Sequence, residues 1–328
     1  MKPSDVLDAA LEASLVLSFA RPGFVLRRWA ERWAPSADDL RGRVFVLTGA
    51  TSGIGRCTAD MLVSRGATLE IVARDRTRAE RVCAALRSAY PGAKVDFVVA
   101  DTGDLDAMRQ AAATLGARHP SVSGLLHNAG ALDDVRSTTP QGLEQTVASH
   151  VVGPFLLTAL LLPSLRAGSG KVVFVSSGGM YSENLDVDAL EMGPRDYDGV
   201  VAYARAKRAQ VTLVQCLASH VPDLEVHSLH PGWADTPGVA RSLPRFRALL
   251  GPMLRTPEQA ADTLVWLAAS RALPDAPRGS FWHDRRPRPL HRLARTARSD
   301  TPQERDRLWA WALSRSGLPS EWPQDHFS

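Results

Sequence analysis

A short apolar run followed at once by a glycine-rich loop limits the fold of this chain more than any other stretch. Val44-Phe45-Val46-Leu47 is typical of a buried strand, and it leads into Thr48-Gly49-Ala50-Thr51-Ser52-Gly53-Ile54-Gly55. An amphipathic helix is expected to follow, to about Arg65. Glycines in such a loop let backbone N–H groups and a helix N-terminus approach a pyrophosphate. The spacing, G-x-x-x-G-x-G, therefore predicts a phosphate-binding turn rather than a plain connection between strand and helix.

The alternation of apolar runs and helical patterns continues along most of the chain. Further strands are expected at residues 68–73, 94–100, 122–127, 171–175, 225–229 and 279–283. One intervening helix, residues 141–165, contains His150, Gly153 and Pro154 and is expected to be kinked or broken. This order predicts an α/β fold, a Rossmann-type doubly wound parallel sheet in a single domain. We place that domain at residues 41–285, between an N-terminal helical extension, residues 1–40, and a C-terminal helical cap, residues 286–328.

The composition is that of an ordinary globular protein and argues against several functions. Among 328 residues, 39 basic and 35 acidic side chains leave a net charge of only +4, so nucleic-acid binding is not expected. Cys57, Cys83 and Cys216 show no metal-ligand spacing, and we expect reduced core residues of a cytoplasmic protein and no metal site. The first residues lack the charge pattern of a signal peptide, and their longest apolar run is too short to span a bilayer.

Ligands of open α/β sheets bind at the carboxyl ends of the strands, so the residues after each predicted strand are site candidates. Arg74 follows the second strand, where an arginine suits the 2′-phosphate of NADP and an acid suits the free ribose of NAD. We therefore favour NADP(H) as the cofactor, while ribose binding by Asp75 beside a solvated Arg74 stays the alternative. Asp101 and Thr102 could meet the adenine, and the small residues of Asn128-Ala129-Gly130 let the backbone pass close to the cofactor.

Tyr203 and Lys207 are four residues apart in a predicted helix and therefore share one of its faces. A nearby ammonium lowers the pKa of a phenol, which would let Tyr203 transfer a proton near neutral pH. Ser177, at the end of the fifth predicted strand, can donate a hydrogen bond to a substrate carbonyl. Together they predict the interconversion of a carbonyl and an alcohol, with the hydride carried by a nicotinamide cofactor.

The order of these motifs resembles the short-chain dehydrogenase/reductase family over roughly residues 41–285. The family's T-G-x-x-x-G-x-G, N-A-G, catalytic serine, Y-x-x-x-K and P-G correspond to Thr48–Gly55, Asn128–Gly130, Ser177, Tyr203–Lys207 and Pro231-Gly232. Residues 176–180, 197–199, 230–238 and 284–287 are similar to the branch called dehydrogenase/reductase family member 12. The cofactor is then expected to contact Gly49, Thr51, Ser52, Gly53, Ile54, Gly55, Arg74, Asp101, Thr102, Asn128, Ala129, Gly130, Tyr203, Lys207, Pro231, Gly232, Trp233 and Thr236.

His150 stands where the family commonly has an asparagine that holds a water in a proton relay. Histidine also hydrogen bonds to water, so His150 is a fourth catalytic candidate that could titrate near neutral pH. The alternative, a helix histidine that faces elsewhere, stays open. So do two other functions on this fold: a regulatory protein that binds the cofactor with little turnover, and an NADP-dependent epimerase or dehydratase, whose usual glycine loop and larger C-terminal domain are not visible.

The N-terminal extension carries Leu7, Leu11, Leu15 and Phe19 on one helical stripe, which Arg21-Pro22-Gly23 is expected to end. An amphipathic helix of this kind suits either peripheral membrane contact or packing on protein. Because the first helix is acidic, we favour packing on the main domain or on a second subunit of a homo-oligomer.

Two later segments, residues 180–199 and 236–255, are expected to form a lid over a small-molecule carbonyl or alcohol. Their apolar residues suggest a lipophilic substrate: Met180, Leu185, Leu190, Leu249, Leu250 and Met253. Trp233 is expected to line the pocket, and Thr236 to bind the cofactor or cap a helix. A run of arginines near the C-terminus is expected to be a solvated face: Arg285, Arg286, Arg288, Arg292, Arg295 and Arg298.

Overall fold

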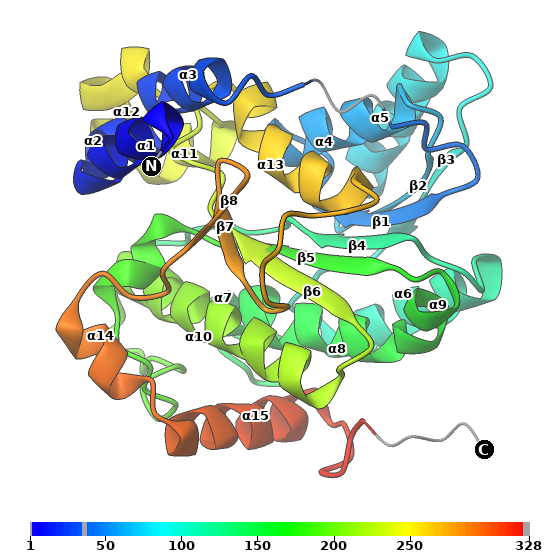
Figure 1. Ribbon diagram of the computed structural model, residues 1–328. Coiled ribbons are helices and arrows are strands. Elements are labelled where there is room, and N and C mark those ends of the chain that lie inside the picture. Colours follow the sequence, from blue (N-terminus) through cyan, green and yellow to red (C-terminus); the bar gives the residue numbers. More distant parts are fainter. Residues whose placement is uncertain (1, 35–37, 324–328) are drawn as a thin grey trace.

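A single eight-stranded sheet with helices on both faces forms the centre of the molecule (Figure 1). The computed structural model describes residues 2–34 and 38–323. The strands are β1 Val44–Thr48, β2 Thr68–Ala73, β3 Val95–Val99, β4 Gly124–His127, β5 Lys171–Val175, β6 Glu225–Leu229, β7 Phe281–His283 and β8 Arg286–Arg288. Their order is β3-β2-β1-β4-β5-β6-β7-β8, with only the β7–β8 pair antiparallel. The predicted α/β fold, a single domain around a mostly parallel sheet, is confirmed.

Two helical layers cover the sheet because its central strands are apolar on both faces. Helices α4 Gly53–Val63, α5 Arg76–Ala89 and α13 Pro257–Ala269 cover one face, and α6 Leu105–Arg118, α8 Gly153–Leu160 and α10 Gly199–His220 cover the other (Figure 1). Helix α15 Pro302–Ser316 packs on the outer side of α8 and α10. Along β1, Phe45 and Leu47 belong to the core under the first layer, whereas Val46 belongs to the core under the second. The strand order reverses between β1 and β4, which is where such sheets bind their ligands.

The shorter helices connect or flank these layers. They are α1 Pro3–Ala13, α2 Leu15–Phe19, α3 Arg21–Ala30, α7 Gln145–Val147, α9 Leu162–Ala167, α11 Pro237–Ser242, α12 Pro244–Leu250 and α14 Ala294–Ser299. A π-helical turn, Ala148–Val152, lies between α7 and α8, so the predicted helix 141–165 is broken as expected. Within the described parts of the chain, no helix is both long enough and apolar enough to cross a membrane.

Two expectations at the ends of the chain were wrong in detail. Arg21-Pro22-Gly23 does not end a helix but begins α3, because proline fits the first turn, where its missing N–H is not needed. The breaks fall instead at Ser14 and Ala20. The sheet does not end with the strand near residue 283, since β8 adds three residues beyond the predicted boundary at 285. The boundaries at residues 40 and 285 stay predictions, and residues 1, 35–37 and 324–328 lie outside the described part.

The arginine-rich run is not a solvated face, because most of its guanidinium groups bind carboxylates. Arg288 pairs with Asp8 at 2.7 Å, and Arg292 pairs with Glu12. Arg286 contacts Glu31 at 2.7 Å. These acids all belong to the N-terminal extension, so the two ends of the chain are joined by ion pairs. Burial alone would raise the pKa of Asp8, but hydrogen bonds and charges from Arg288 and Arg27 lower it to about 2.

Asp284 is the buried centre of this network. Its carboxylate pairs with Arg27 at 2.6 Å and with Arg255 at 2.5 Å, and all three side chains are about 1% exposed. Although burial opposes its ionisation, Arg255 and its other neighbours hold the pKa of Asp284 well below its usual range. Asp284 stabilises the fold through its ion pairs with both arginines. Loss of either partner would leave an unpaired buried charge, which is strongly destabilising.

Asp284→Asn is expected to lower the free energy of unfolding by about 3–5 kcal/mol, since it leaves the buried Arg255 guanidinium without its carboxylate. Urea unfolding of the full chain measures this. Asp39→Asn, which removes an exposed pair with Arg41, is the matched control and should change stability little. Equal unfolding curves for the two variants would show that the buried network does not hold the fold together.

Candidate active site

The glycine loop is tied to the end of β4 by one side-chain hydroxyl. Thr48 Oγ1 accepts hydrogen bonds from the backbone N–H groups of Asn128 and Ala129, at 3.0 and 2.9 Å. The Asn128 amide donates to the carbonyl oxygens of Thr48 and Gly49, at 3.2 and 3.1 Å. Asn128 and Ala129 therefore brace the loop. Thr48 was not among the predicted site residues, although its place at the end of a buried strand could have indicated it.

The loop has the shape that a dinucleotide phosphate requires. Gly49 has φ +73°, which favours glycine, and a Cβ on Gly55 would lie 2.2 Å from the Gly49 carbonyl oxygen. This close turn leaves the first N–H groups of α4 without a side-chain cap, and Ser52 at the N-cap position is exposed. Uncapped N–H groups at a helix N-terminus bind phosphate well, so the residues present fit a nicotinamide dinucleotide.

The residues after β2 bear on the choice between NADP, bound by Arg74, and NAD, bound by Asp75. Asp75 caps α5, accepting from the Arg78 N–H at 3.0 Å, and its carboxylate pairs with the Arg78 guanidinium at 3.3 Å. Arg74 is exposed, and its guanidinium makes no hydrogen bond or ion pair within the described residues. At the end of β3, Asp101 accepts from the Gly103 N–H at 2.8 Å, with Thr102 beside it. The free cation and the engaged acid favour a phosphate ligand at this position.

The predicted catalytic side chains come together at the end of β5. Ser177 lies two residues after the end of β5, and its Oγ accepts from the Gly179 N–H at 3.2 Å. Tyr203 lies in the first turns of α10, with its phenol near enough to the Ser177 side chain to feel it electrostatically. Lys207 is one turn further along α10, with its Nζ 5.6 Å from the centre of the Tyr203 ring. The two hydroxyl groups thus lie beside each other, with the amine behind them.

The electrostatics of this group differ from the sequence-based expectation. Lys207 is 2% exposed, its Nζ donates to the Val175 carbonyl at 2.7 Å, and burial lowers its pKa to about 7. Burial raises the pKa of Tyr203, and the nearby Ser177 side chain opposes this shift only in part. The expected pKa of the phenol, below its usual value, is therefore not what this structure gives, because burial disfavours the charged forms of both groups and outweighs the lowering contributions.

His150 lies within this group, on the π-helical turn. Its ring packs edge-to-face on Tyr203, with ring centroids 5.2 Å apart, and its Nε2 accepts from the Ala131 N–H at 3.1 Å. Burial, followed by the charge of Lys207, holds the pKa of His150 well below its usual value, so a titration near neutral pH is wrong. The ring fixes the loop after Gly130, and whether it also serves a water relay stays a prediction.

Gln210 is a site residue that the sequence analysis missed. Its Oε1 accepts from Lys207 Nζ at 3.3 Å, and its Nε2 donates to the His150 carbonyl at 2.8 Å. An amide that donates through nitrogen and accepts through oxygen fixes the position of its neighbours. The i, i+3 spacing from Lys207 places both side chains on one helix face and could have indicated it.

The segment after β6 lies beside the glycine loop. Thr236 caps α11, accepting from the Val239 N–H at 3.2 Å, and its methyl carbon lies 3.2 Å from where a Cβ of Gly53 would stand. Trp233 follows Pro231-Gly232 and is half-buried, with its ring edge-to-face on Phe246 of α12 at 5.1 Å. The carboxyl ends of β1, β4, β5 and β6 thus converge on one site, next to α11 and α12.

The predicted lid is only partly present. Met180, Leu185 and Leu190 are at most 3% exposed and belong to the hydrophobic cores, so they cannot face a substrate. In contrast, neither α11 nor α12 has a buried residue, and Leu249 is 80% exposed. Of the two predicted lid segments, residues 236–255 alone keep apolar side chains at the surface.

This fold and site are those of a nicotinamide-dependent oxidoreductase, and the family comparison agrees. The family model described as short chain dehydrogenase matches residues 43–245, and the chain belongs to the short-chain dehydrogenase/reductase family. It is 37% identical to human dehydrogenase/reductase SDR family member 12 over 82% of this chain and 85% of that protein. It is 32% identical to mouse polyprenol dehydrogenase over 84% of each chain.

Solved structures show the same fold. A short chain dehydrogenase from Escherichia coli CFT073, complexed with NADPH, is 27% identical with a TM-score of 0.59. The match covers 72% of this chain and 94% of that one. Among the described residues no group of three His, Cys, Asp or Glu side chains could hold a metal ion. The family relationship makes this chain an oxidoreductase that binds a nicotinamide cofactor.

The burial of Lys207 predicts that stability depends on pH. Its pKa is 10.5 in the unfolded chain and about 7 when folded, so between these values the unfolded chain binds the extra proton. The free energy of unfolding should therefore rise with pH, by up to about 1.4 kcal/mol per unit. Lys207→Met should lose this rise when urea unfolding is followed from pH 7 to about 9.5.

The control for this test is Lys94→Met, which removes an exposed lysine and should keep the slope of the wild-type protein. The pKa values of His127 and His150, the histidines that feel the Lys207 charge, are lowered and do not interfere in this range. Parallel curves for the wild-type protein and Lys207→Met would contradict a depressed lysine pKa.

Proposed function

We propose that this protein is an NADP-dependent oxidoreductase that interconverts a carbonyl and an alcohol through Ser177, Tyr203 and Lys207. The observation that carries the proposal is the joint placement of the Ser177 and Tyr203 hydroxyl groups, with the Lys207 amine, at the strand ends that face the glycine loop. A cluster of this kind binds and protonates an oxygen that gains negative charge.

The cofactor would be held by the glycine loop and the residues after the neighbouring strands. The N-terminus of α4 would hold the pyrophosphate, Arg74 would bind the 2′-phosphate, and Asp101 would contact the adenine. When bound, the nicotinamide supplies or accepts the hydride. The preference for NADP rests on the free Arg74 guanidinium and on the engaged Asp75 carboxylate, and the NADPH complex of the Escherichia coli relative supports it.

Each of the three side chains has a separate part in the chemistry. The Ser177 hydroxyl donates a hydrogen bond to the substrate oxygen and holds it against the Tyr203 phenol. Tyr203 gives its proton to that oxygen in reduction and takes it back in oxidation. Protonated Lys207 stabilises the phenolate formed in between, and Gln210 and the Val175 carbonyl keep its Nζ in place.

A lipophilic substrate fits the surface next to this group. Trp233 and Phe246 stack edge-to-face beside the site, and the exposed helices α11 and α12 carry Leu249 and Leu250. The name of the mouse relative, polyprenol dehydrogenase, points to an isoprenoid alcohol for that protein, which is consistent with an apolar substrate here. A homo-oligomer and a cytoplasmic location stay predictions.

Tyr203→Phe is expected to lower kcat for NADPH-dependent reduction by about 10²–10⁴-fold, because the proton donor is lost while the ring that packs on His150 remains. A panel of aldehydes and ketones, both short and long-chain, identifies a substrate by NADPH consumption. NADPH binding, followed by fluorescence, should persist in the variant. Tyr90→Phe, whose hydroxyl contacts Asp60, is the control.

Full activity of Tyr203→Phe would refute the mechanism. A wild-type protein that binds NADPH and consumes none across the panel would favour the regulatory alternative.

Arg74→Ala is expected to raise KM for NADPH by roughly ten- to a hundredfold and to leave KM for NADH unchanged, because only the 2′-phosphate contact is removed. Steady-state kinetics with both cofactors measures the change. Arg81→Ala, on the exposed side of α5, is the matched control and should leave both values alone. An equal effect on the two cofactors would place the 2′-phosphate elsewhere.

A further inference from the structure

The N-terminal helices expose an unusual amount of apolar surface. Of the twelve large hydrophobic residues that are clearly exposed among residues 2–34 and 38–323, seven lie on α1, α2 and α3: Val6, Leu15, Val16, Leu17, Val25, Leu26 and Trp29. The largest of them, Trp29, is 77% exposed. Single exposed apolar residues are common on protein surfaces, but a group on three consecutive short helices marks an interaction site. We call this group the N-terminal apolar face.

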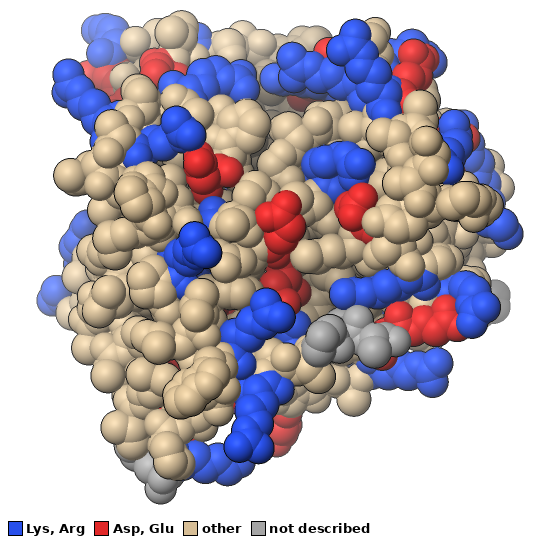
Figure 2. Space-filling view, turned by 90° about the horizontal axis from the view of Figure 1, so that it is seen from above, with Lys and Arg blue, Asp and Glu red and all other residues tan. Residues whose placement is uncertain are grey.

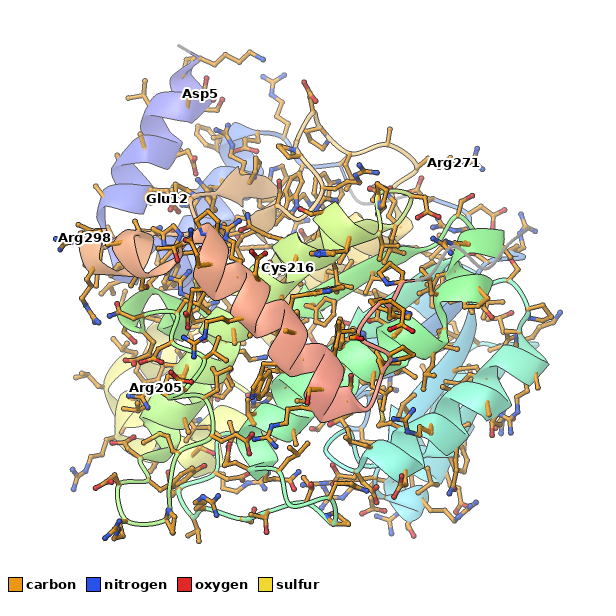
Figure 3. All side chains as sticks on the ribbon, turned by 90° about the horizontal axis from the view of Figure 1, so that it is seen from below. Asp5, Glu12, Arg205, Cys216, Arg271 and Arg298 are labelled. Carbon is orange, nitrogen blue, oxygen red and sulfur yellow. The ribbon has the colours of Figure 1, made fainter. Side chains whose placement is uncertain are left out.

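The acids of α1–α3 and of the α3 C-cap all lie on the inner side of these helices. These four acids, Asp5, Asp8, Glu12 and Glu31, are each paired with arginines of the C-terminal segment, and Arg27 joins them inside. Figure 3 labels Asp5 and Glu12 along α1. Helices α1–α3 are thus acidic on their inner side only. The acidity of the first helix, which favoured packing on protein over a membrane partner, therefore does not apply to their outer side.

The outer side carries cations with no anion to pair with. Arg21, Arg28 and Arg32 are exposed, and their guanidinium groups form no hydrogen bond or ion pair within the described residues. From above, the part of the surface on the side of these helices is largely uncharged, and Lys and Arg outnumber Asp and Glu there (Figure 2). Apolar residues, an exposed tryptophan and unpaired arginines together are typical of helices that lie in the interface of an anionic membrane.

The apolar face is continuous with the lid of the proposed site. Phe19 of α2 packs edge-to-face on Trp233, which packs in turn on Phe246 of α12, with ring centroids 5.7 and 5.1 Å apart. The helices α1–α3 and α12 lie together at one corner of the molecule (Figure 1). Leu249 therefore extends the exposed apolar surface to the mouth of the site.

The catalytic loop itself contacts this extension. A Cβ on Gly178, directly after Ser177, would lie 2.7 Å from the Phe19 ring, so only glycine lets α2 pack so closely against the loop. The Phe19 ring also packs edge-to-face on His230, at 4.2 Å. A surface held against α1–α3 would thus lie near the entrance that an apolar substrate has to use.

We propose that α1–α3 and α12 dock this protein on the surface of an anionic lipid bilayer. The N-terminal apolar face enters the interface, and Arg21, Arg28 and Arg32 contact lipid phosphates. A second copy of the chain is a poorer occupant. A twofold contact would place these arginines against their own copies, with no acid in the patch to offset the repulsion. The docking is independent of the proposed activity and is tested without it.

The test is flotation of the full chain with two kinds of vesicle, phosphatidylcholine alone and phosphatidylcholine with a quarter phosphatidylglycerol. Binding is expected to the anionic vesicles, and to weaken in high salt. The double variant Leu17→Glu, Trp29→Glu should bind roughly tenfold less or worse. Arg21→Gln with Arg28→Gln should lose about 30-fold on anionic vesicles. Each changed residue is exposed, so melting temperatures should match the wild-type protein.

Val99→Glu is the matched control, because Val99 is 42% exposed on the edge strand β3, at the opposite side of the molecule (Figure 1). It should bind vesicles like the wild-type protein. The proposal is overturned if the wild-type protein fails to float with anionic vesicles, or if the double variant binds as well as Val99→Glu. Light scattering tests the alternative, in which a second copy of the chain covers this face. The face is a subunit interface if the wild-type protein is a dimer, the double variant is a monomer, and neither binds vesicles.

Discussion

The carboxylate of Asp284 connects the N-terminal extension to the catalytic domain, and much of the site's outer wall depends on it. Arg255, which Asp284 holds, also donates to the Ser18 and Phe19 carbonyl oxygens, at 2.8 and 2.9 Å. Those bonds fix the end of α2, and Phe19 then packs against Gly178 and the rings around it. A carboxylate outside the reacting group thus positions the surface next to the Ser177 loop, because buried charges hold their partners in one geometry.

Burial governs the catalytic group in a different way. Burial is the largest influence on the pKa values of Lys207, Tyr203 and His150, and no carboxylate contributes to these shifts. The charged form of each side chain is therefore disfavoured. Under these conditions an ammonium on Lys207 and a phenolate on Tyr203 favour each other, because opposite charges attract more strongly in a buried site than in water. The bonds from Lys207 to Val175 and Gln210 matter because they offset part of the desolvation of the amine.

The sequence predicted the sheet well, and it predicted that the candidate catalytic residues follow the ends of its strands, because both follow from local patterns. Strands β2, β5 and β6 begin and end where the apolar runs do, and the glycine loop follows β1 directly. Gln210 was missed because its role depends on a carbonyl sixty residues away. The lid prediction was wrong for residues 180–199 because the sequence does not show whether an apolar residue such as Leu185 faces a substrate or the hydrophobic core. The expected phenol pKa failed for a related reason, since a spacing shows proximity and not burial.

The N-terminal extension shows why net charge along a segment is a poor guide to its partner. Its acids lie on one side of the short helices and its exposed arginines on the other, so a charge count over residues 1–33 averages two unlike surfaces. The acids pair with arginines that come 280 residues later in the chain, which a local sequence pattern does not show. Only after those pairs form does the outer surface become apolar and basic. The ion pairs that attach the extension to the fold are therefore also what leaves its other side suited to an anionic lipid surface.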